Sequence, residues 1–334
     1  MTNEIQRPIS NAIRQEKTAE TLLEYRNGFT RADDEYAPMV ERYYKLVTDF
    51  YEFGWGQSFH FAPIRKGDSL EESIANHQRF LGDALDLKPG MNVLDVGCGV
   101  GGPQRSLAKK YGATVTGLNI SEYQLQKCAE YNEKSGLAEL CHVLLGDFMA
   151  VPADDESFDA AYHIEAIAAH APDKKTAYEE LFRVLKPGAI FAGYEWCMTP
   201  SYDANKKEHR EIKEAIEYGN ALPQIASFSD VENSLQSAGF ELIETNDRAF
   251  EADSDTPWYR PLEGSVRTLR GFPRSTAGRK VTSTVLRVLE SLRLVPQGAY
   301  ETQEILNIAA DSLVAGGRLG IFTPMYYHKA RKPN

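Results

Sequence analysis

The chain has 334 residues, enough for one large α/β domain or two smaller ones with a substantial core. Its net charge of −11 argues against nucleic acid as a partner, because phosphate binding needs a basic face and basic residues cluster only at 329–332. The 4 cysteines stand singly inside apolar patterns, which argues against a secreted disulfide framework or a cysteine metal site and indicates a reducing compartment.

The N-terminal part of the chain contains an unusual aromatic stretch. Residues 1–35 are polar and weakly patterned, and we expect a mobile arm there. From Tyr36 to Tyr51 apolar residues recur at helical spacing. The chain then enters residues 51–61, where Tyr, Trp, Phe and His alternate with glycine and small polar residues. Two interpretations stay open: these aromatic side chains fill a core, or they form the wall of a pocket whose π faces attract a cation.

A glycine-rich loop follows the first expected strand. After a helix expected at 69–85, an apolar run ends in Asp95 and breaks into the glycines of 97–102. Such a loop lets a ligand approach the backbone amides. The spacing fits a dinucleotide fingerprint, but that fingerprint needs an acid about 20 residues later, where this chain has Asn119. An acid before the glycines favours the cationic S-adenosylmethionine (SAM), while a plain turn that binds nothing is the remaining alternative.

Strands and helices alternate after the loop, which predicts a doubly wound sheet. Further strands are expected at 113–118, 142–145, 158–164, 189–196, 240–245 and 318–328, and helices at 121–134, 174–185, 202–218, 278–292 and 301–315. Ser229 is expected to cap a further helix that ends at Gly239, and the helix at 202–218 is expected to cover the site as a lid. Residues 253–274 indicate an ordered loop with short helices, because disordered segments carry few large apolar groups.

Polar residues at the strand ends extend the expected site. Asp147 is placed to accept a hydrogen bond from an adenine amino group, with Phe148 beside the ring. Glu165 and His170 follow the next strand. Because ligands of doubly wound sheets bind beyond the carboxyl ends of the strands, all four lie on the functional rim.

These residues carry a resemblance to the sterol C24-methyltransferase family over nearly the whole chain after about residue 35. The stretches that carry it are 51–56, 58–61, 94–103, 117–119, 123–124, 146–149, 164–166, 194–196, 198–199, 257–259 and 322–325. The glycine motif alone indicates SAM methyltransferases in general. The aromatic stretch and Tyr194-Glu195-Trp196 are far more specific.

The resemblance implies an α/β fold with a doubly wound, seven-stranded sheet of the class I SAM-dependent (Rossmann-like) type. It divides the chain into a mobile arm at 1–35, a helical and aromatic cap on the substrate side at 36–88, a SAM-binding core at 89–250 and a C-terminal region with the closing strand at 251–334. It implies methyl transfer from SAM to C24 of a Δ24-sterol through a carbocation, a hydride shift and loss of a proton. A dry aromatic wall would protect that cation from water.

The candidate residues follow from the motifs and the resemblance together. Candidate catalytic residues are Tyr51, Glu52, Trp55, His60, His170 and Glu195, and the final base is one of Glu52, His60, His170 and Glu195. Candidate cofactor-binding residues are Asp95, Gly97, Gly99, Gly101, Asn119, Gln124, Gly146, Asp147, Phe148 and Glu165, and no metal is expected.

The expected partners are a sterol, a second copy of the chain and, peripherally, a lipid surface. No signal peptide or membrane-spanning run is expected, which indicates a cytoplasmic protein at the periphery of the endoplasmic reticulum or another sterol-containing membrane. The segment 165–172 departs from the family pattern by one extra residue and a missing cysteine. Two alternatives therefore stay open: a SAM enzyme that acts on another lipid or triterpene, and a lipid- or SAM-binding protein without turnover.

Overall fold

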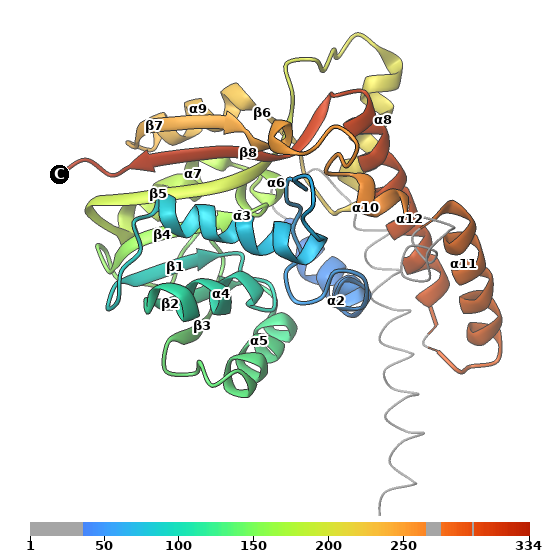
Figure 1. The fold of residues 1–334 in the computed structure, drawn as a ribbon, viewed down its shortest axis with the longest axis horizontal. Coiled ribbons are helices and arrows are strands. Elements are labelled where there is room, and N and C mark those ends of the chain that lie inside the picture. Colours follow the sequence, from blue (N-terminus) through green and yellow to red (C-terminus); the bar gives the residue numbers. More distant parts are fainter. Residues whose placement is uncertain (1–35, 265–274, 296) are drawn as a thin grey trace, which may run out of the picture.

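The computed structural model describes residues 36–264, 275–295 and 297–334 (Figure 1). Its centre is an eight-stranded sheet in the order β3-β2-β1-β4-β5-β8-β7, with the two-residue β6 paired to β5. The strands are β1 (Asn92–Val96), β2 (Thr114–Asn119), β3 (Cys141–Leu145), β4 (Phe158–Ile164), β5 (Leu185–Met198), β6 (Ala226–Ser227), β7 (Glu241–Asp247) and β8 (Phe322–Arg331). The expected doubly wound sheet is confirmed, and the short β6 is the strand that the sequence pattern did not predict.

The strand order reverses direction at β1. Val93 of β1 pairs in parallel with Val115 of β2 on one side and with Ala160 of β4 on the other. Of the described strands, only β8 runs antiparallel to its neighbours, between β5 and β7. In a sheet of this kind, ligands bind where the strand order reverses, beyond the carboxyl ends of the strands.

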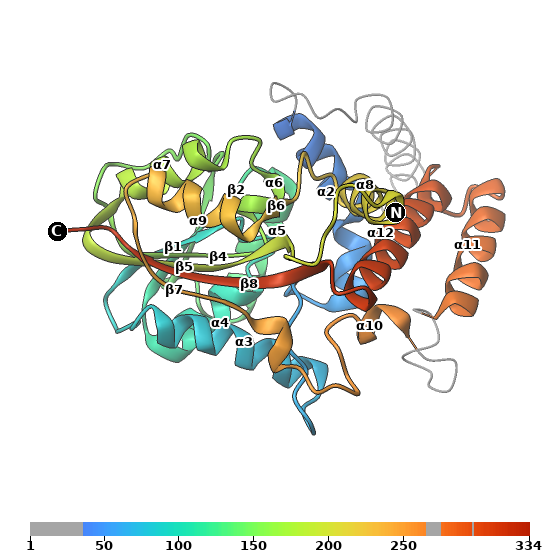
Figure 2. The same ribbon diagram turned by 90° about the horizontal axis from the view of Figure 1, so that it is seen from above.

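Helices cover both faces of the sheet, as Figure 2 shows. The helices α3 (Leu70–Ala84) and α4 (Gly102–Tyr111) cover one face, and α5 (Glu122–Lys134) joins them through a hydrogen bond of 3.0 Å from Arg105 Nη1 to Asn132 Oδ1. The other face carries α7 (Lys174–Val184) and α9 (Phe228–Ser237). Two separate hydrophobic cores result, one on each side of the sheet, because parallel strands are buried on both faces.

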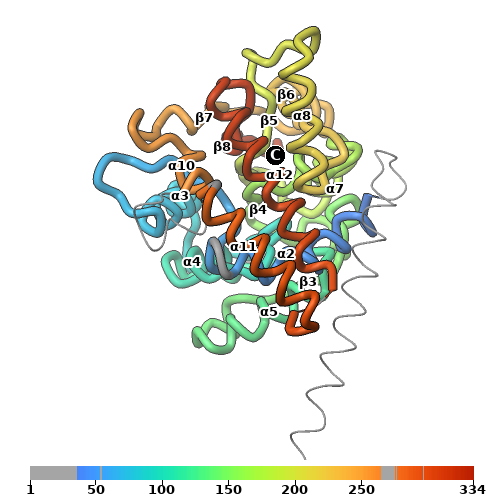
Figure 3. The backbone as a smooth tube through the Cα atoms, turned by 90° about the vertical axis from the view of Figure 1, so that its right-hand side faces the viewer, coloured from blue at the N-terminus to red at the C-terminus, as the bar shows by residue number. Residues whose placement is uncertain are grey.

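A third group of helices stands beyond one end of the sheet. It contains α2 (Tyr36–Trp55), α8 (Lys207–Gly219), α11 (Thr276–Ser291) and α12 (Ala299–Arg318), and α11 is the outermost of them in Figures 1 and 2. Figure 3 views the molecule from this end, with α11 and α12 toward the viewer. Short helices complete the chain: α6 (Ile167–His170), η2 (Arg248–Glu251) and α10 (Arg260–Glu263).

Several expected boundaries need correction. The helix α2 continues through Tyr51 to Trp55, so the aromatic stretch begins as helix. Ser227, not Ser229, caps α9, because its hydroxyl accepts from the Asp230 amide while the Asp230 carboxylate accepts from the Ser227 amide. The helix α12 runs to Arg318, so the closing strand starts at Phe322. The expected arm at 1–35 lies outside the described residues.

The helix that covers the site is α12 and not the helix expected at 202–218. Helix α8 packs against α12, and the side chains that face the site come from α12. Within the described residues, no helix combines the length and apolarity that crossing a bilayer requires.

Candidate active site

A cavity of about 900 Å³ lies beyond the carboxyl ends of β1, β2 and β4. Its walls come from α2, the glycine-rich loop, the segment after β4, Trp196 of β5 and the facing sides of α11 and α12. Ligand cavities in proteins commonly occupy roughly 300–1,000 Å³. This volume is at the upper end of that range and suits two ligands in contact.

The glycine-rich loop forms one end of the cavity. Asp95 is buried there, and its Oδ2 atom makes no hydrogen bond of normal geometry among the described residues, although the Tyr162 hydroxyl lies beside the carboxyl. Burial raises the pKa of this carboxyl to about 7. Gly99 has φ 56°, and a Cβ atom at this position would project toward Phe59, 3.8 Å away, into the space that the cavity occupies. The loop therefore offers an open backbone and an unsatisfied carboxylate, which fits a cationic amino-acid end such as that of SAM.

Asn119 lies at the end of β2 and is tied to α2 through a relay of amides. Its Nδ2 donates to Gln124 Oε1 at 2.8 Å, and Gln124 Nε2 donates to Thr48 Oγ1 of α2 at 3.0 Å. Both Asn119 and Gln124 line the cavity. The relay fixes the side of the cavity where a ribose would lie, and it makes α2 part of the cofactor end.

Asp147 lies beside Gly146 and Phe148 at the third strand end. Its Oδ1 accepts hydrogen bonds from the Tyr36 hydroxyl at 2.5 Å and from the Met149 amide at 2.8 Å. All of these residues except Met149 line the cavity, and the rings of Tyr36 and Phe148 are 6.5 Å apart. The sequence pattern identified Tyr36 only as the start of a helix. Its contact with Asp147 becomes visible only when α2 is folded onto the sheet.

The aromatic stretch lies against the other part of the cavity. Tyr51, Trp55, Phe59 and Phe61 all line it. Tyr51 packs edge-on against Phe59 with ring centroids 5.6 Å apart, and Trp55 packs edge-on against Phe61 at 5.1 Å. Phe61 also belongs to the hydrophobic cluster that includes Trp196. The aromatic rings therefore do both things that the sequence left open: they pack on one another as a core does, and they form a wall of the cavity.

Glu165 lies where the cofactor end of the cavity meets the aromatic stretch. It follows β4 with a φ of 60°, a left-handed conformation that is strained for a residue with a side chain. Its Oε1 accepts from the Phe61 amide at 2.7 Å, and its Oε2 accepts from Trp196 Nε1 at 2.8 Å. Burial raises the pKa of this carboxyl to about 8 even with two donors. The sequence grouped Glu165 with the cofactor residues, whereas its contacts are with the aromatic part.

Both candidate histidines, His60 and His170, line the cavity, and they differ in their hydrogen bonds. Nδ1 of His60 lies 2.7 Å from the Phe61 carbonyl oxygen and its Nε2 lies 2.9 Å from Gln78 Nε2, so both ring nitrogens are engaged. His170 Nε2 lies 3.0 Å from the Tyr44 hydroxyl. Burial lowers the pKa of each histidine to about 4, so both are neutral at physiological pH.

Glu52 and Gly101 lie outside the cavity. Glu52 points from α2 toward α5, where its carboxylate pairs with Lys127 at 2.5 Å and accepts from the Tyr131 hydroxyl at 2.5 Å. Gly101 is a packing position, because a Cβ there would lie 2.4 Å from Cys128 Sγ. Neither residue lines the cavity, so their expected places in the site are corrected.

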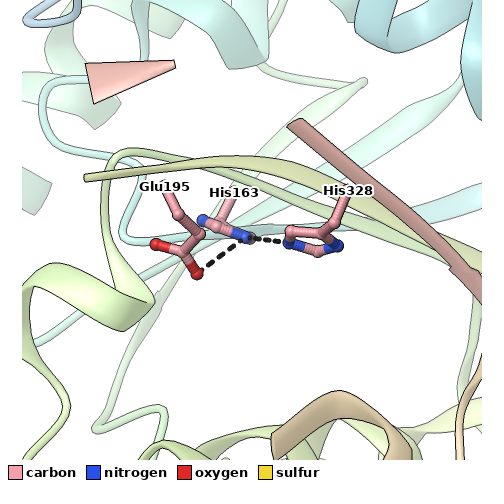
Figure 4. Close-up of side chains that lie close together, drawn as sticks. All are labelled: His163, Glu195 and His328. Carbon is pink, nitrogen blue, oxygen red and sulfur yellow. Dashed lines mark hydrogen bonds and ion pairs between the residues drawn. The ribbon is translucent and has the colours of Figure 1, made fainter. Parts of the chain in front are cut away.

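Glu195 is likewise inside the core instead of the cavity. It accepts hydrogen bonds from the Tyr178 hydroxyl at 2.7 Å and from the Ala168 amide at 2.8 Å. Figure 4 shows it beside two buried histidines: His163 Nε2 lies 3.3 Å from Glu195 Oε1 and 2.8 Å from His328 Nε2. Its carboxylate therefore holds α6 and α7 to the sheet.

Polar residues of α11 and α12 form the end of the cavity that sequence analysis missed. Arg279, Thr282, Gln303 and Asn307 line it, and Arg279 Nη1 is buried without a hydrogen-bond partner among the described residues. The other amino group of the guanidinium, Nη2, pairs with Asp311. The signal available in the sequence is polar residues on the inward side of two amphipathic helices, which by itself does not reveal a cavity.

Two family models match the chain. The model described as "Methyltransferase domain" matches residues 94–193, and the model described as "Sterol methyltransferase C-terminal" matches residues 269–334. The first of these ranges contains the glycine-rich loop, Asp147 and Glu165, and the second contains α11 and α12.

Similar proteins carry names that agree with these models. Cycloartenol-C-24-methyltransferase 1 of Oryza sativa subsp. japonica is 49% identical over 298 residues, which cover 89% of this chain and 86% of the relative. Sterol 24-C-methyltransferase of Yarrowia lipolytica is 42% identical over 307 residues, 90% of this chain and 80% of the relative. The solved cyclopropane synthase MmaA2 of Mycobacterium tuberculosis has the same fold, with a TM-score of 0.65 at 18% identity over 88% of this chain and 97% of that chain.

Proposed function

The chain belongs to the sterol 24-C-methyltransferase family, and from this premise we propose that its cavity holds SAM against the side chain of a Δ24-sterol and that the methyl group passes to C24. The family, the class I methyltransferase fold and the SAM cofactor expected from the sequence are confirmed. The observation that carries the proposal is the continuity of one cavity from the glycine-rich loop, past Glu165, to the aromatic stretch and the polar end at α11.

The cofactor end suits SAM because its polar groups follow one another in the same order as the ammonium group, ribose and adenine of that molecule, and because their charge is complementary. Bound SAM supplies a methyl group on a cationic sulfur. Asp95 would receive the ammonium group, which satisfies the carboxylate oxygen that has no partner in the described part of the chain. Asn119 would contact the ribose, and Asp147 and Phe148 would contact the adenine. A cation beside Asp95 also returns the pKa of its carboxyl toward the ordinary value.

The aromatic part suits the charge that methylation of an alkene creates. Addition of a methyl group to C24 leaves a tertiary carbocation on the sterol, which must survive a hydride shift before a proton is lost. The rings of Tyr51, Trp55, Phe59 and Phe61 exclude water and attract positive charge through their π faces. Each such face contributes roughly 0.5–2 kcal/mol.

We assign the final proton transfer to Glu165. Asp95 and Asp147 lie at the cofactor end, whereas the Glu165 carboxylate is fixed between Phe61 and Trp196 of the aromatic part. A carboxyl whose pKa is raised to about 8 by burial is a much stronger base, once ionised, than an ordinary carboxylate. His170, with Tyr44 beside it, is the second proton acceptor within the cavity wall, and His60 has no free nitrogen.

The polar end at α11 would set the direction of the sterol. A guanidinium donates hydrogen bonds and accepts none, so the Nη1 of Arg279, which has no partner among the described residues, suits the oxygen of a ring hydroxyl. With that oxygen held at α11, the side-chain double bond points toward Glu165 and the cofactor end.

The test is incubation of the purified protein with methyl-labelled SAM and a Δ24-sterol, followed by mass spectrometry of the product. We expect a sterol one CH2 unit heavier, with the label on the side chain, and no product from the same sterol with a saturated side chain. Transfer of label to another amphiphile, with none to the Δ24-sterol, would show that the family relationship does not extend to the acceptor. Binding of both ligands without transfer would establish a binding protein.

A further inference from the structure

The outer face of α11 exposes a line of apolar side chains. Val281, Val285, Val288 and Leu292 are 51%, 48%, 53% and 61% exposed, and Leu294, just beyond the helix, is 68% exposed. The spacing i, i+4, i+7, i+11 places the first four on one side of a helix. These five residues, the α11 stripe, make up five of the 11 large apolar side chains exposed in the described part of the chain. Such a concentration marks an interaction surface instead of scattered surface residues.

The opposite side of the same helix faces the cavity. Arg279, Thr282 and Leu286 line it, and Ser283 Oγ donates to Glu304 Oε1 of α12 at 2.7 Å. The helix α11 therefore separates the polar end of the cavity from the surroundings of the protein. In Figures 1 and 2 α11 is the outermost helix of its end of the molecule, and the exposed fractions of the stripe residues show that the described part of the chain leaves the stripe uncovered.

Basic side chains accompany the stripe. Lys280 and Arg287 are exposed on α11, each one position before a stripe residue, and Arg293 is exposed just after the helix. Because successive helical residues are about 100° apart, Lys280 and Arg287 share one flank of the stripe. Glu290, the acidic residue of α11, is used internally, since it accepts from the Gly298 and Tyr300 amides. This surface is therefore basic in a chain whose net charge is −11.

We propose that the α11 stripe inserts into the boundary between head groups and acyl chains of a membrane that contains anionic lipids. An apolar line with a basic flank is the pattern of helices that lie in a membrane interface. The proposal rests on the proposed function in one respect: a sterol acceptor is itself a membrane lipid, and the docked helix forms the wall of its site. A second copy of the chain is disfavoured in the antiparallel twofold arrangement, which would bring the flanks with Lys280 and Arg287 of both copies together.

The test measures binding of the full chain to vesicles of phosphatidylcholine alone and of phosphatidylcholine with phosphatidylserine. We expect binding to the anionic vesicles that weakens with salt, and at least a tenfold loss in the double variant Val285→Asp/Val288→Asp. The matched control is Phe250→Asp, an aromatic residue that is 87% exposed on η2, away from α11, and should bind as the wild type does. Should the double variant fail to fold, Lys280→Glu/Arg287→Glu tests the same surface through its charge.

Activity separates this proposal from the proposed function. With sterol supplied on cyclodextrin, the double variant should match the wild type, and with sterol supplied in anionic vesicles its rate should fall at least tenfold. If the wild type transfers no methyl group to sterol from either cyclodextrin or vesicles, the proposed function is refuted, while the vesicle-binding measurement still tests the α11 stripe. Equal binding of wild type and both double variants to anionic vesicles, or a wild-type dimer that the variant dissociates without any vesicle binding, would overturn the proposal.

Discussion

Replacement of Glu165 by glutamine should separate its charge from its shape. The wild-type carboxylate accepts from the Phe61 amide and from Trp196 Nε1. A glutamine has one oxygen to accept with, so one of these buried N–H groups loses its partner, which costs roughly 1–3 kcal/mol of folding stability. The variant keeps the volume of the side chain and the apolar surface of the cavity, so it should fold and bind SAM.

The expected loss of turnover is larger than the loss of stability explains. A carboxylate and a carbocation about 5 Å apart attract by about 3 kcal/mol at an effective dielectric constant of about 20. Because about 1.4 kcal/mol corresponds to a factor of ten in rate, Glu165→Gln should lower turnover by about two orders of magnitude. Loss of the proton acceptor should also leave more of any product that forms by deprotonation elsewhere.

The pH profile of turnover distinguishes this role from a structural one. The folded pKa of about 8 predicts that wild-type turnover falls on the acidic side, and the positive charge of bound SAM moves that limb to lower pH. The glutamine variant should lose the limb. Trp196→Phe removes one donor from the carboxylate, so it should raise the pKa of Glu165 and move the limb to higher pH. A Glu165→Gln enzyme with wild-type turnover within threefold and an unchanged pH profile would refute this reasoning.

Three further predictions concern the rest of the cavity. Asp95→Asn should weaken SAM binding by one to two orders of magnitude, about 1.5–3 kcal/mol for a hydrogen bond to a charged group, and unchanged affinity by calorimetry would remove Asp95 from the cofactor site. Tyr51→Leu should lower turnover about tenfold or more and change the product ratio while SAM affinity survives, whereas Tyr51→Phe keeps the π face; equal losses in both variants would make the hydroxyl bond to Tyr43 the cause. Burial raises the pKa of Asp95, Glu165 and Glu195 and lowers that of His60 and His170, so below about pH 6.5 the two sets change stability in opposite directions. Above that pH the folded protein without cofactor still holds carboxyl protons that the unfolded chain has released, so its melting temperature should fall between about pH 7 and pH 8, and a rise over that range would contradict the assigned shifts.

The cofactor end was predictable because its signals are local in the chain. Asp95, Gly99 and Asp147 each follow an apolar run, and parallel strands bring their carboxyl ends to one edge whatever the details of packing. The expected bounds of β4 agree with the structure for the same reason, since a strand buried on both faces gives a continuous apolar run.

The choice among the acidic residues was not predictable, because it depends on the direction of each side chain. Glu52 stands between aromatic residues in the sequence, but α2 continues as a helix and turns each residue by about 100° from the one before, so Tyr51 faces the cavity and Glu52 faces α5. Glu195 and Trp196 are neighbours on β5, where successive side chains point to opposite faces. Trp196 therefore reaches Glu165, and Glu195 reaches α7.

The helix α2 has a consequence for the order in which ligands leave. It contacts the cofactor end of the cavity through Tyr36 and Thr48, and the aromatic part through Tyr44 and Tyr51. One displacement of this helix would open both ends together, so spent cofactor and methylated sterol should depart in the same event. A second methylation of the same sterol needs the sterol to stay while the cofactor is exchanged. We therefore expect a distributive enzyme, which releases its product after each methyl group and accepts it again only as a new substrate.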